Sequence, residues 1–138
     1  MSEEVREIYI ELWSLCKDVE RPLCHKYRSL RELFERVARE QMQNVSLQAT
    51  DLAARINYLS TQFSFDGWLK YALHTFRLTS NDVMNHRKEP LDDEFFRDVR
   101  SVTEAVHVML HTPIPKELAE TLPSRMSKKS MKRGENVL

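Results

Sequence analysis

Five polar side chains that could do chemistry lie close together in the chain: His74, Arg77, Asn81, Asn85 and His86. Arginine is a permanent cation with five hydrogen-bond donors, which suits a phosphate group. Asparagine both donates and accepts hydrogen bonds, and histidine is the side chain able to transfer a proton near pH 7. A set of this composition could bind a phosphodiester and cleave it with the help of a ribose 2′-hydroxyl.

The spacing places four of these residues on one side of a helix. His74, Arg77, Asn81 and Asn85 follow one another at steps of three or four residues, which form one row on a helical surface. The row lies beside an apolar stripe, and His86 follows near the end of the helix. Arg and Asn in such a place can also bind free carbonyls of neighbouring segments, and His86 can cap the helix. From the residue types alone we favour this structural role over a catalytic one.

Two helices are predicted in the first part of the chain. Apolar residues recur at three- and four-residue steps over residues 3–19, and Trp13 falls on this apolar face as an anchor of the core. Pro22 closes that segment. Ser29 and Glu32 have the spacing of a capping box, which predicts that the second helix begins there.

The third helix is predicted to begin near Ser46 or Thr50. Its apolar stripe fades before residue 63. We expect Phe63 and Phe65, which follow it, to close one end of the core.

The fourth and fifth helices carry clear start signals. Asp66 is expected to cap the fourth helix, in which Trp68 is a second core anchor. The fifth helix is expected to begin with Asp92 as its N-cap residue. Leu91 and Phe96 flank this cap at the spacing of a hydrophobic staple.

The composition limits the fold class, because 2 glycines cannot supply the turns of a multi-stranded β fold or a Gly-rich phosphate loop. We expect an all-α protein, an antiparallel bundle of four to five helices, with a further short turn of helix over residues 116–121. The bundle domain should cover residues 1–122. Residues 123–138 should form a basic flexible tail or linker.

The charges balance over the whole chain but not within the tail. The formal net charge is zero, which argues against a basic footprint covering the domain. The basic tail could bind RNA or DNA without sequence preference. Its basic residues are Arg125, Lys128, Lys129, Lys132 and Arg133.

The remaining sequence features predict a cytoplasmic protein without a metal or another cofactor. No apolar run has the length of a signal peptide or a membrane span, so no membrane partner is expected. Cys16 and Cys24 are expected to be free thiols in a reducing compartment. His107 and His111 have the spacing of two zinc ligands on one helix, but no third ligand is evident.

The segment around Arg77 resembles helical domains of the HEPN (higher eukaryotes and prokaryotes nucleotide-binding) superfamily, in the prokaryotic branch found beside helicases and restriction-enzyme subunits. The matching residues are, in order, Leu73, Phe76, Arg77, Asn81, His86 and Pro90. The resemblance implies a helical bundle over residues 27–110. It also implies a metal-independent ribonuclease site formed across a dimer, in which His86 acts on the proton, Arg77 holds the phosphate and Asn81 or Asn85 orients it.

Eight residues separate Arg77 from His86, which is a wider gap than in ribonuclease members of the superfamily. We therefore expect that the chain is not an enzyme on its own. It should be a non-catalytic interaction or dimerisation module, either a homodimer or docked on a partner protein. The resemblance implies that it is an accessory domain of a helicase, restriction or defence protein that processes nucleic acids. The alternatives are a HEPN-type ribonuclease and nucleic-acid binding through the basic tail.

Overall fold

The computed structural model describes residues 1–42 and 51–125, and all regular secondary structure in these two ranges is α-helical. The helices are α1 (Glu3–Lys17), α2 (Leu23–Gln41), α3 (Leu52–Gln62), α4 (Gly67–Met84), α5 (Asp92–Leu110) and α6 (Lys116–Thr121). The prediction of an all-α fold is confirmed for this part of the chain. The described residues hold six helices, because the expected turn over residues 116–121 is itself a regular helix.

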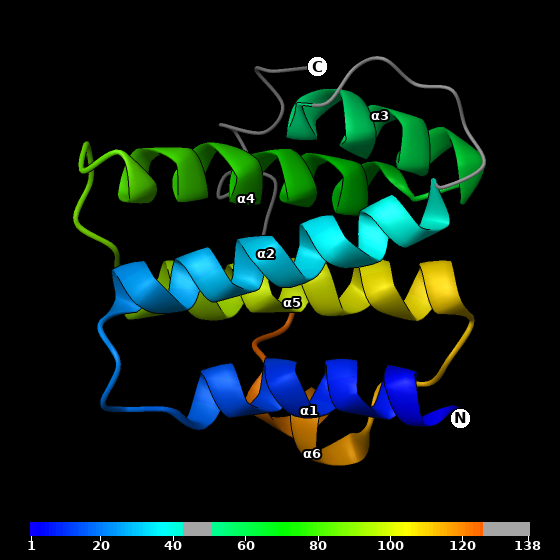
Figure 1. Ribbon diagram of the computed structural model, residues 1–138, viewed down its shortest axis with the longest axis horizontal. Coiled ribbons are helices and arrows are strands. Elements are labelled where there is room, and N and C mark those ends of the chain that lie inside the picture. Colours follow the sequence, from blue (N-terminus) through cyan, green and yellow to red (C-terminus); the bar gives the residue numbers. More distant parts are fainter. Residues whose placement is uncertain (43–50, 126–138) are drawn as a thin grey trace.

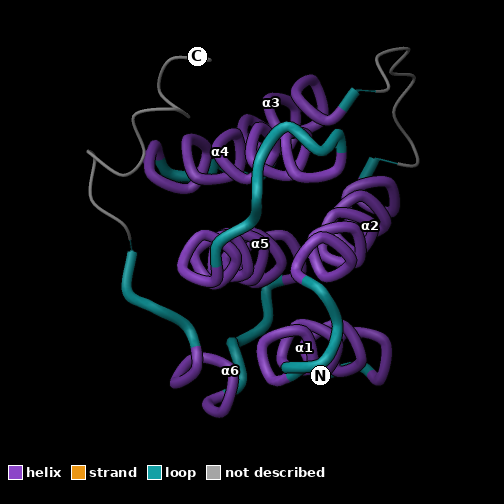
Figure 2. Tube along the Cα trace, turned by 90° about the vertical axis from the view of Figure 1, so that its left-hand side faces the viewer, coloured by secondary structure: helices purple, strands orange, loops and turns teal. Residues whose placement is uncertain are grey.

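The helices stack in three layers (Figure 1 and Figure 2). One outer layer holds α3 and α4, the central layer holds α2 and α5, and the other outer layer holds α1 and α6. The successive pairs α1–α2, α3–α4 and α4–α5 run antiparallel, whereas α2 and α5 run in the same direction (Figure 1). The central layer therefore joins two helices that are distant in the sequence.

Helix α5 is the centre of the core, because it packs against α1, α2 and α4. Its stripe of Phe95, Val99, Val102 and Val106 is fully buried. Apolar residues at three- and four-residue steps produce this continuous face. Tyr27 of α2 meets Phe95 edge to face, with 5.2 Å between the ring centroids.

Helix α1 covers the other side of α5 and turns two large apolar side chains outward. Its buried residues are Tyr9, Leu12, Leu15 and Cys16. Trp13 is 39% exposed and Ile10 is 54% exposed, so the prediction that Trp13 anchors the core is wrong. The helix ends at Lys17 instead of residue 19. The Tyr9 hydroxyl lies 2.8 Å from Thr112 Oγ1, which ties α1 to the segment between α5 and α6.

The predicted capping box at the start of the second helix is wrong. Helix α2 begins at Leu23, with Pro22 in the N-cap position, and Ser29 lies inside the helix. The proline ring fixes a φ that suits the entry to a helix, so the chain turns helical directly after it. Ser29 Oγ instead accepts a hydrogen bond from Arg21 Nη1 at 3.2 Å.

The predicted cap and staple of the fifth helix are also wrong. Asp92 is the first helical residue, and Leu91 occupies the N-cap position without a side-chain hydrogen bond. Leu91 is 56% exposed, so it does not pack as a staple. The carboxylates of Asp92, Asp93 and Glu94 act on this helix end through the helix dipole.

Two aspartates cap helices through their side chains. The prediction for Asp66 is confirmed, because its carboxylate accepts from the backbone N–H three residues later at 2.8 Å and so caps α4. Asp51 caps α3 with the same geometry at 2.8 Å. Ser46 and Thr50, the predicted starts of this helix, lie outside the described residues.

The link between α3 and α4 closes one end of the core, as predicted. Phe63 and Phe65 stack with 6.4 Å between their ring centroids and pack against the buried cluster. Trp68, the second predicted anchor, also packs against that cluster. Within residues 1–42 and 51–125, no helix combines the length and apolar composition of a membrane span.

Candidate functional site

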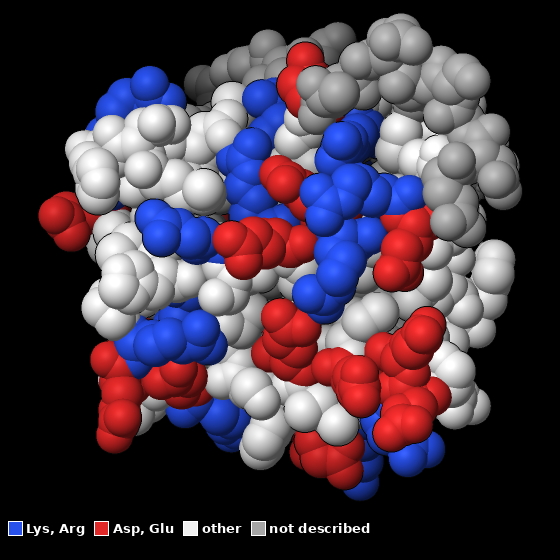
Figure 3. Space-filling view, in the orientation of Figure 1, with Lys and Arg blue, Asp and Glu red and all other residues white. Residues whose placement is uncertain are grey.

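Basic side chains gather on the face over α2 and α4, with acidic side chains among them (Figure 3).

The predicted polar row of α4 begins at His74, which is only 1% exposed. His74 Nε2 lies 2.9 Å from Asn57 Oδ1 of α3, and His74 Nδ1 accepts a hydrogen bond from Arg77 Nε at 3.3 Å. Because Nδ1 is an acceptor, the proton of the neutral ring is on Nε2 and is donated to Asn57.

His74 is neutral near pH 7. Burial lowers its pKa to about 4, with smaller contributions from the positive charges of Arg77 and Lys70. An imidazole that is buried, uncharged and bonded at both nitrogens has no free position for a substrate proton. His74 therefore orients Arg77 and joins α4 to α3.

Asn81 and Asn85 bind other parts of the protein. Asn81 Oδ1 accepts a short hydrogen bond from Arg31 Nη1 of α2, and Ser80 Oγ accepts from the same nitrogen at 3.1 Å. Arg31 Nε pairs with Glu35 at 2.9 Å, so its guanidinium is held from two sides. Asn85 Nδ2 donates to the carbonyl of Asn81 at 2.8 Å, at the last turn of α4.

His86 terminates α4 through its backbone. Its φ is 57°, in the left-handed region that glycine usually occupies after a helix. The His86 N–H donates to the Val83 carbonyl at 3.2 Å, and the Arg87 N–H donates to the Asp82 carbonyl at 2.8 Å. These two bonds define a Schellman motif with His86 at the C′ position. The side chain of His86 is exposed.

Arg77 and His86 are not brought to one site within a single chain. Helix α4 ends at Met84, so His86 lies in the left-handed turn beyond the helix, whereas Arg77 lies about two turns before the helix end. His86 lines a cleft of about 310 Å³ together with Cys24 and the start of the α4–α5 link. Arg77 does not line this cleft.

The described part of the predicted basic tail lies on the bundle. Arg125 Nη2 lies 3.0 Å from Asp66 Oδ2 and 2.8 Å from Glu104 Oε1. The guanidinium carbon lies 4.4 Å from the centroid of the Trp68 ring. The other predicted tail residues lie outside the described ranges: Lys128, Lys129, Lys132 and Arg133.

The histidine pair of α5 takes part in ending this helix. His107 Nδ1 makes a short hydrogen bond with the Thr112 carbonyl, and His111 has a φ of 52° just after the last turn. The described residues contain no group of three His, Cys, Asp or Glu side chains placed to hold a metal ion.

The sequence reasoning missed a buried polar cluster between α2, α4 and α5. Asp98 is 0% exposed, accepts from the Tyr27 hydroxyl at 2.7 Å and pairs with Arg97 Nε at 3.1 Å. Arg97 Nη2 reaches Thr79 Oγ1 at 3.3 Å. Burial raises the pKa of Asp98 to about 6, against the opposing effects of Arg97 and Tyr27. An acid within the apolar stripe of α5, next to an arginine, was the available signal.

The sequence reasoning also missed an apolar groove of about 520 Å³ between α1 and α6. The buried side chains of Tyr9 and Leu118 contribute to its lining. Met1, Ile10 and Trp13 also line it and are 56%, 54% and 39% exposed. The available signal was the three-residue step from Ile10 to Trp13, which defines a second apolar face on α1.

Comparison with known proteins gives no relative: no family model, no curated protein and no solved structure matches this chain. The resemblance to HEPN domains therefore has only the sequence as its support.

Proposed function

We propose that this protein is a non-catalytic helical interaction module that pairs with a second copy of itself through the α1–α6 face. The apolar groove on this face is the observation that carries the proposal. Ile10 and Trp13 expose about half and two-fifths of their surfaces there, at 54% and 39%. Adjoining apolar side chains of this size are a common mark of a protein interface, and tryptophan is enriched among the residues that dominate binding energy.

The charges beside the groove favour a second copy as the occupant. Arg6 and Glu117 both line it, one from α1 and one from α6. A two-fold axis brings residue i of one copy against residue j of the other, and j against i. Arg6 of each copy can therefore meet Glu117 of the other. The formal net charge of zero adds no long-range repulsion between copies.

The polar row of α4 supports a module without its own catalytic centre. His74 and Asn81 are both used to bind other helices, and His86 is used to end one. The wider role, as an accessory domain of a protein that processes nucleic acids, is supported only by the sequence resemblance.

The proposal is tested by measuring solution mass with sedimentation velocity over a concentration series. We expect the native chain to approach twice 16.4 kDa as the concentration rises. Ile10→Asp should shift it to the monomer, because the dimer would have to remove a carboxylate from water where the native chain buries an apolar side chain. Val19→Asp is the matched control: Val19 is 93% exposed and does not line the groove, so this variant should still dimerise. A native chain that is monomeric up to its solubility limit would overturn the proposal.

A further inference from the structure

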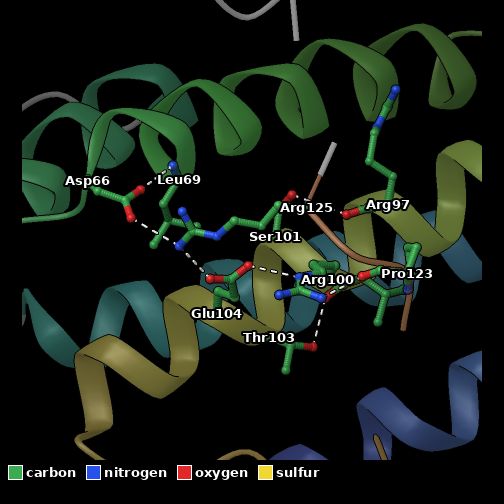
Figure 4. Close-up of polar contacts among 10 residues, drawn as sticks. Asp66, Leu69, Arg97, Arg100, Ser101, Thr103, Glu104, Pro123 and Arg125 are labelled. Atoms are coloured by element: carbon green, nitrogen blue, oxygen red, sulfur yellow. Dashed lines mark hydrogen bonds and ion pairs between the residues drawn. The ribbon is translucent and has the colours of Figure 1, made fainter. Parts of the chain in front are cut away.

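The segment after α6 crosses α5 and ends with the side chain of Arg125 against the start of α4 (Figure 4). Asp66, Glu104 and Trp68 surround this guanidinium. Two of its contacts are charged, at 3.0 Å from Asp66 and 2.8 Å from Glu104. The third is the face of the Trp68 ring, with 4.4 Å between the guanidinium carbon and the ring centroid. Two carboxylates beside an indole ring match the in-plane donors and the flat surface of a guanidinium.

Each of these three side chains is also held by a contact that does not involve Arg125. Asp66 Oδ1 accepts from the Leu69 N–H at 2.8 Å as the cap of α4, which leaves Oδ2 for the guanidinium. Glu104 Oε2 accepts from Arg100 Nε at 2.9 Å, which leaves Oε1. Trp68 packs against the hydrophobic core. The arrangement is therefore maintained by the bundle itself.

The bundle also binds the backbone two residues before Arg125. Arg100 Nη1 donates to the Pro123 carbonyl at 2.5 Å, while its Nε holds Glu104 (Figure 4). A ligand that fits is thus an extended peptide with an arginine and a free carbonyl two positions before it. Without Arg125, Asp66 and Glu104 would carry two negative charges and Arg100, which pairs with Glu104, one positive charge, so these three side chains would keep a net negative charge.

We propose that Asp66, Trp68 and Glu104 form a recognition site for the arginine of an extended peptide, which Arg125 occupies in cis and which an arginine of another polypeptide can take in its place. The Arg125 side chain is 41% exposed, so an incoming chain reaches this site without opening the core. A cis ligand competes at a high effective concentration, and the site is consequently closed to weak ligands in the native chain. This inference is independent of the α1–α6 face.

The test uses the probe peptide acetyl-Leu-Pro-Ser-Arg-amide, which repeats residues 122–125. The chain has 2 tryptophans, so Trp13→Phe leaves Trp68 as the single fluorescent reporter. We expect the Trp13→Phe/Arg125→Ala chain to bind the probe with a saturable change in Trp68 fluorescence. The Trp13→Phe chain that keeps Arg125 should bind at least about tenfold more weakly.

Two controls separate recognition from nonspecific association. A peptide with citrulline in place of arginine has the same shape without the charge and should not bind. Glu104→Gln in the Arg125→Ala background should weaken binding of the arginine peptide. Arg125→Gln keeps a polar side chain without the guanidinium and repeats the experiment if Arg125→Ala does not fold. Equal binding of both peptides, or equal affinity with and without Arg125, would overturn the proposal.

Discussion

The most informative single residue is His86, because its left-handed backbone conformation accounts for the way in which α4 ends. Three residues other than glycine have positive φ in the described chain: Ser64, His86 and His111. Each follows the last turn of a helix. Ser64 and His86 allow both Schellman bonds to form, and after His111 the Thr112 N–H donates to the His107 carbonyl. A residue with a Cβ atom adopts this conformation at a cost of about 1 kcal/mol.

His86→Gly should therefore stabilise the protein. We expect the free energy of unfolding to rise by roughly 0.5–1 kcal/mol, because glycine adopts the left-handed conformation without the steric cost. Urea denaturation measures this change. Arg87→Gly is the control, because Arg87 does not have a positive φ and should gain nothing.

The same variant examines the ribonuclease alternative. A catalytic His86 would make His86→Gly inactive in an RNA-cleavage assay in which the native chain cleaves. We expect the native chain and the variant to give the same background in this assay. A native activity that His86→Gly abolishes would contradict a purely structural role.

At the scale of the helices, the polar row of α4 joins neighbouring elements. Arg31 of α2 reaches both Ser80 and Asn81 of α4, and His74 reaches Asn57 of α3. The row therefore makes hydrogen bonds on both sides of α4. These bonds fix the positions of α2 and α3 relative to α4.

Asn81→Ala should weaken the packing of α2 on α4. We expect a loss of about 1–2 kcal/mol in the free energy of unfolding, because the half-buried Arg31 loses a hydrogen-bond partner. A double-mutant cycle with Arg31→Ala should give a coupling energy on the order of 1 kcal/mol. Asn85→Ala removes only a bond within α4 and should cost less. A coupling energy near zero would contradict this contact.

Local signals predicted the helices well and their ends unevenly. The apolar periods located the helices, and Asp66 was identified as a cap because its side chain acts within its own segment. Ser29 matches a capping box and Leu91 a hydrophobic staple equally well in sequence. In the structure, however, Ser29 lies inside α2 and Leu91 occupies the N-cap position of α5. Pro22 had already started α2, and the chain direction before α5 left Leu91 in solvent.

The composition of the polar row could be predicted, but its partners could not. Periodicity places His74 and Asn81 on one side of α4. Asn57 and Arg31 come from other helices, and nothing local to α4 selects them. The same limit applies to Trp13, because the side of α1 that meets α5 is decided by packing.

At the scale of the whole molecule, two buried groups make opposite contributions to the dependence of stability on pH. The pKa of His74 falls from 6.5 to about 4 on folding, so its contribution is lost as the pH falls through this range. The pKa of Asp98 rises from 3.8 to about 6, so its contribution is lost as the pH rises through that range. Between about pH 4 and 6 the two effects oppose each other.

Replacing one group at a time should separate the two effects. We expect His74→Gln to remove the acid-side loss, so that its stability at pH 4.5 relative to pH 7.5 exceeds that of the native chain by roughly 2 kcal/mol. Asp98→Asn should change this difference in the opposite direction. Urea unfolding at both pH values provides the measurement. A difference that neither variant alters would contradict the assignment.

The bond between Tyr9 and Thr112 has a consequence for synthesis of the chain. It spans 103 residues, and α1 packs against α5 and α6, which are translated after it. At usual translation rates, a chain of this length between the two partners takes about 5 to 20 s to make. During that interval the apolar side of α1 has left the ribosome while two of the helices that cover it do not yet exist. Helix α1 therefore leaves the ribosome well before it can complete its docking, and its apolar side stays uncovered for longer when translation is slower.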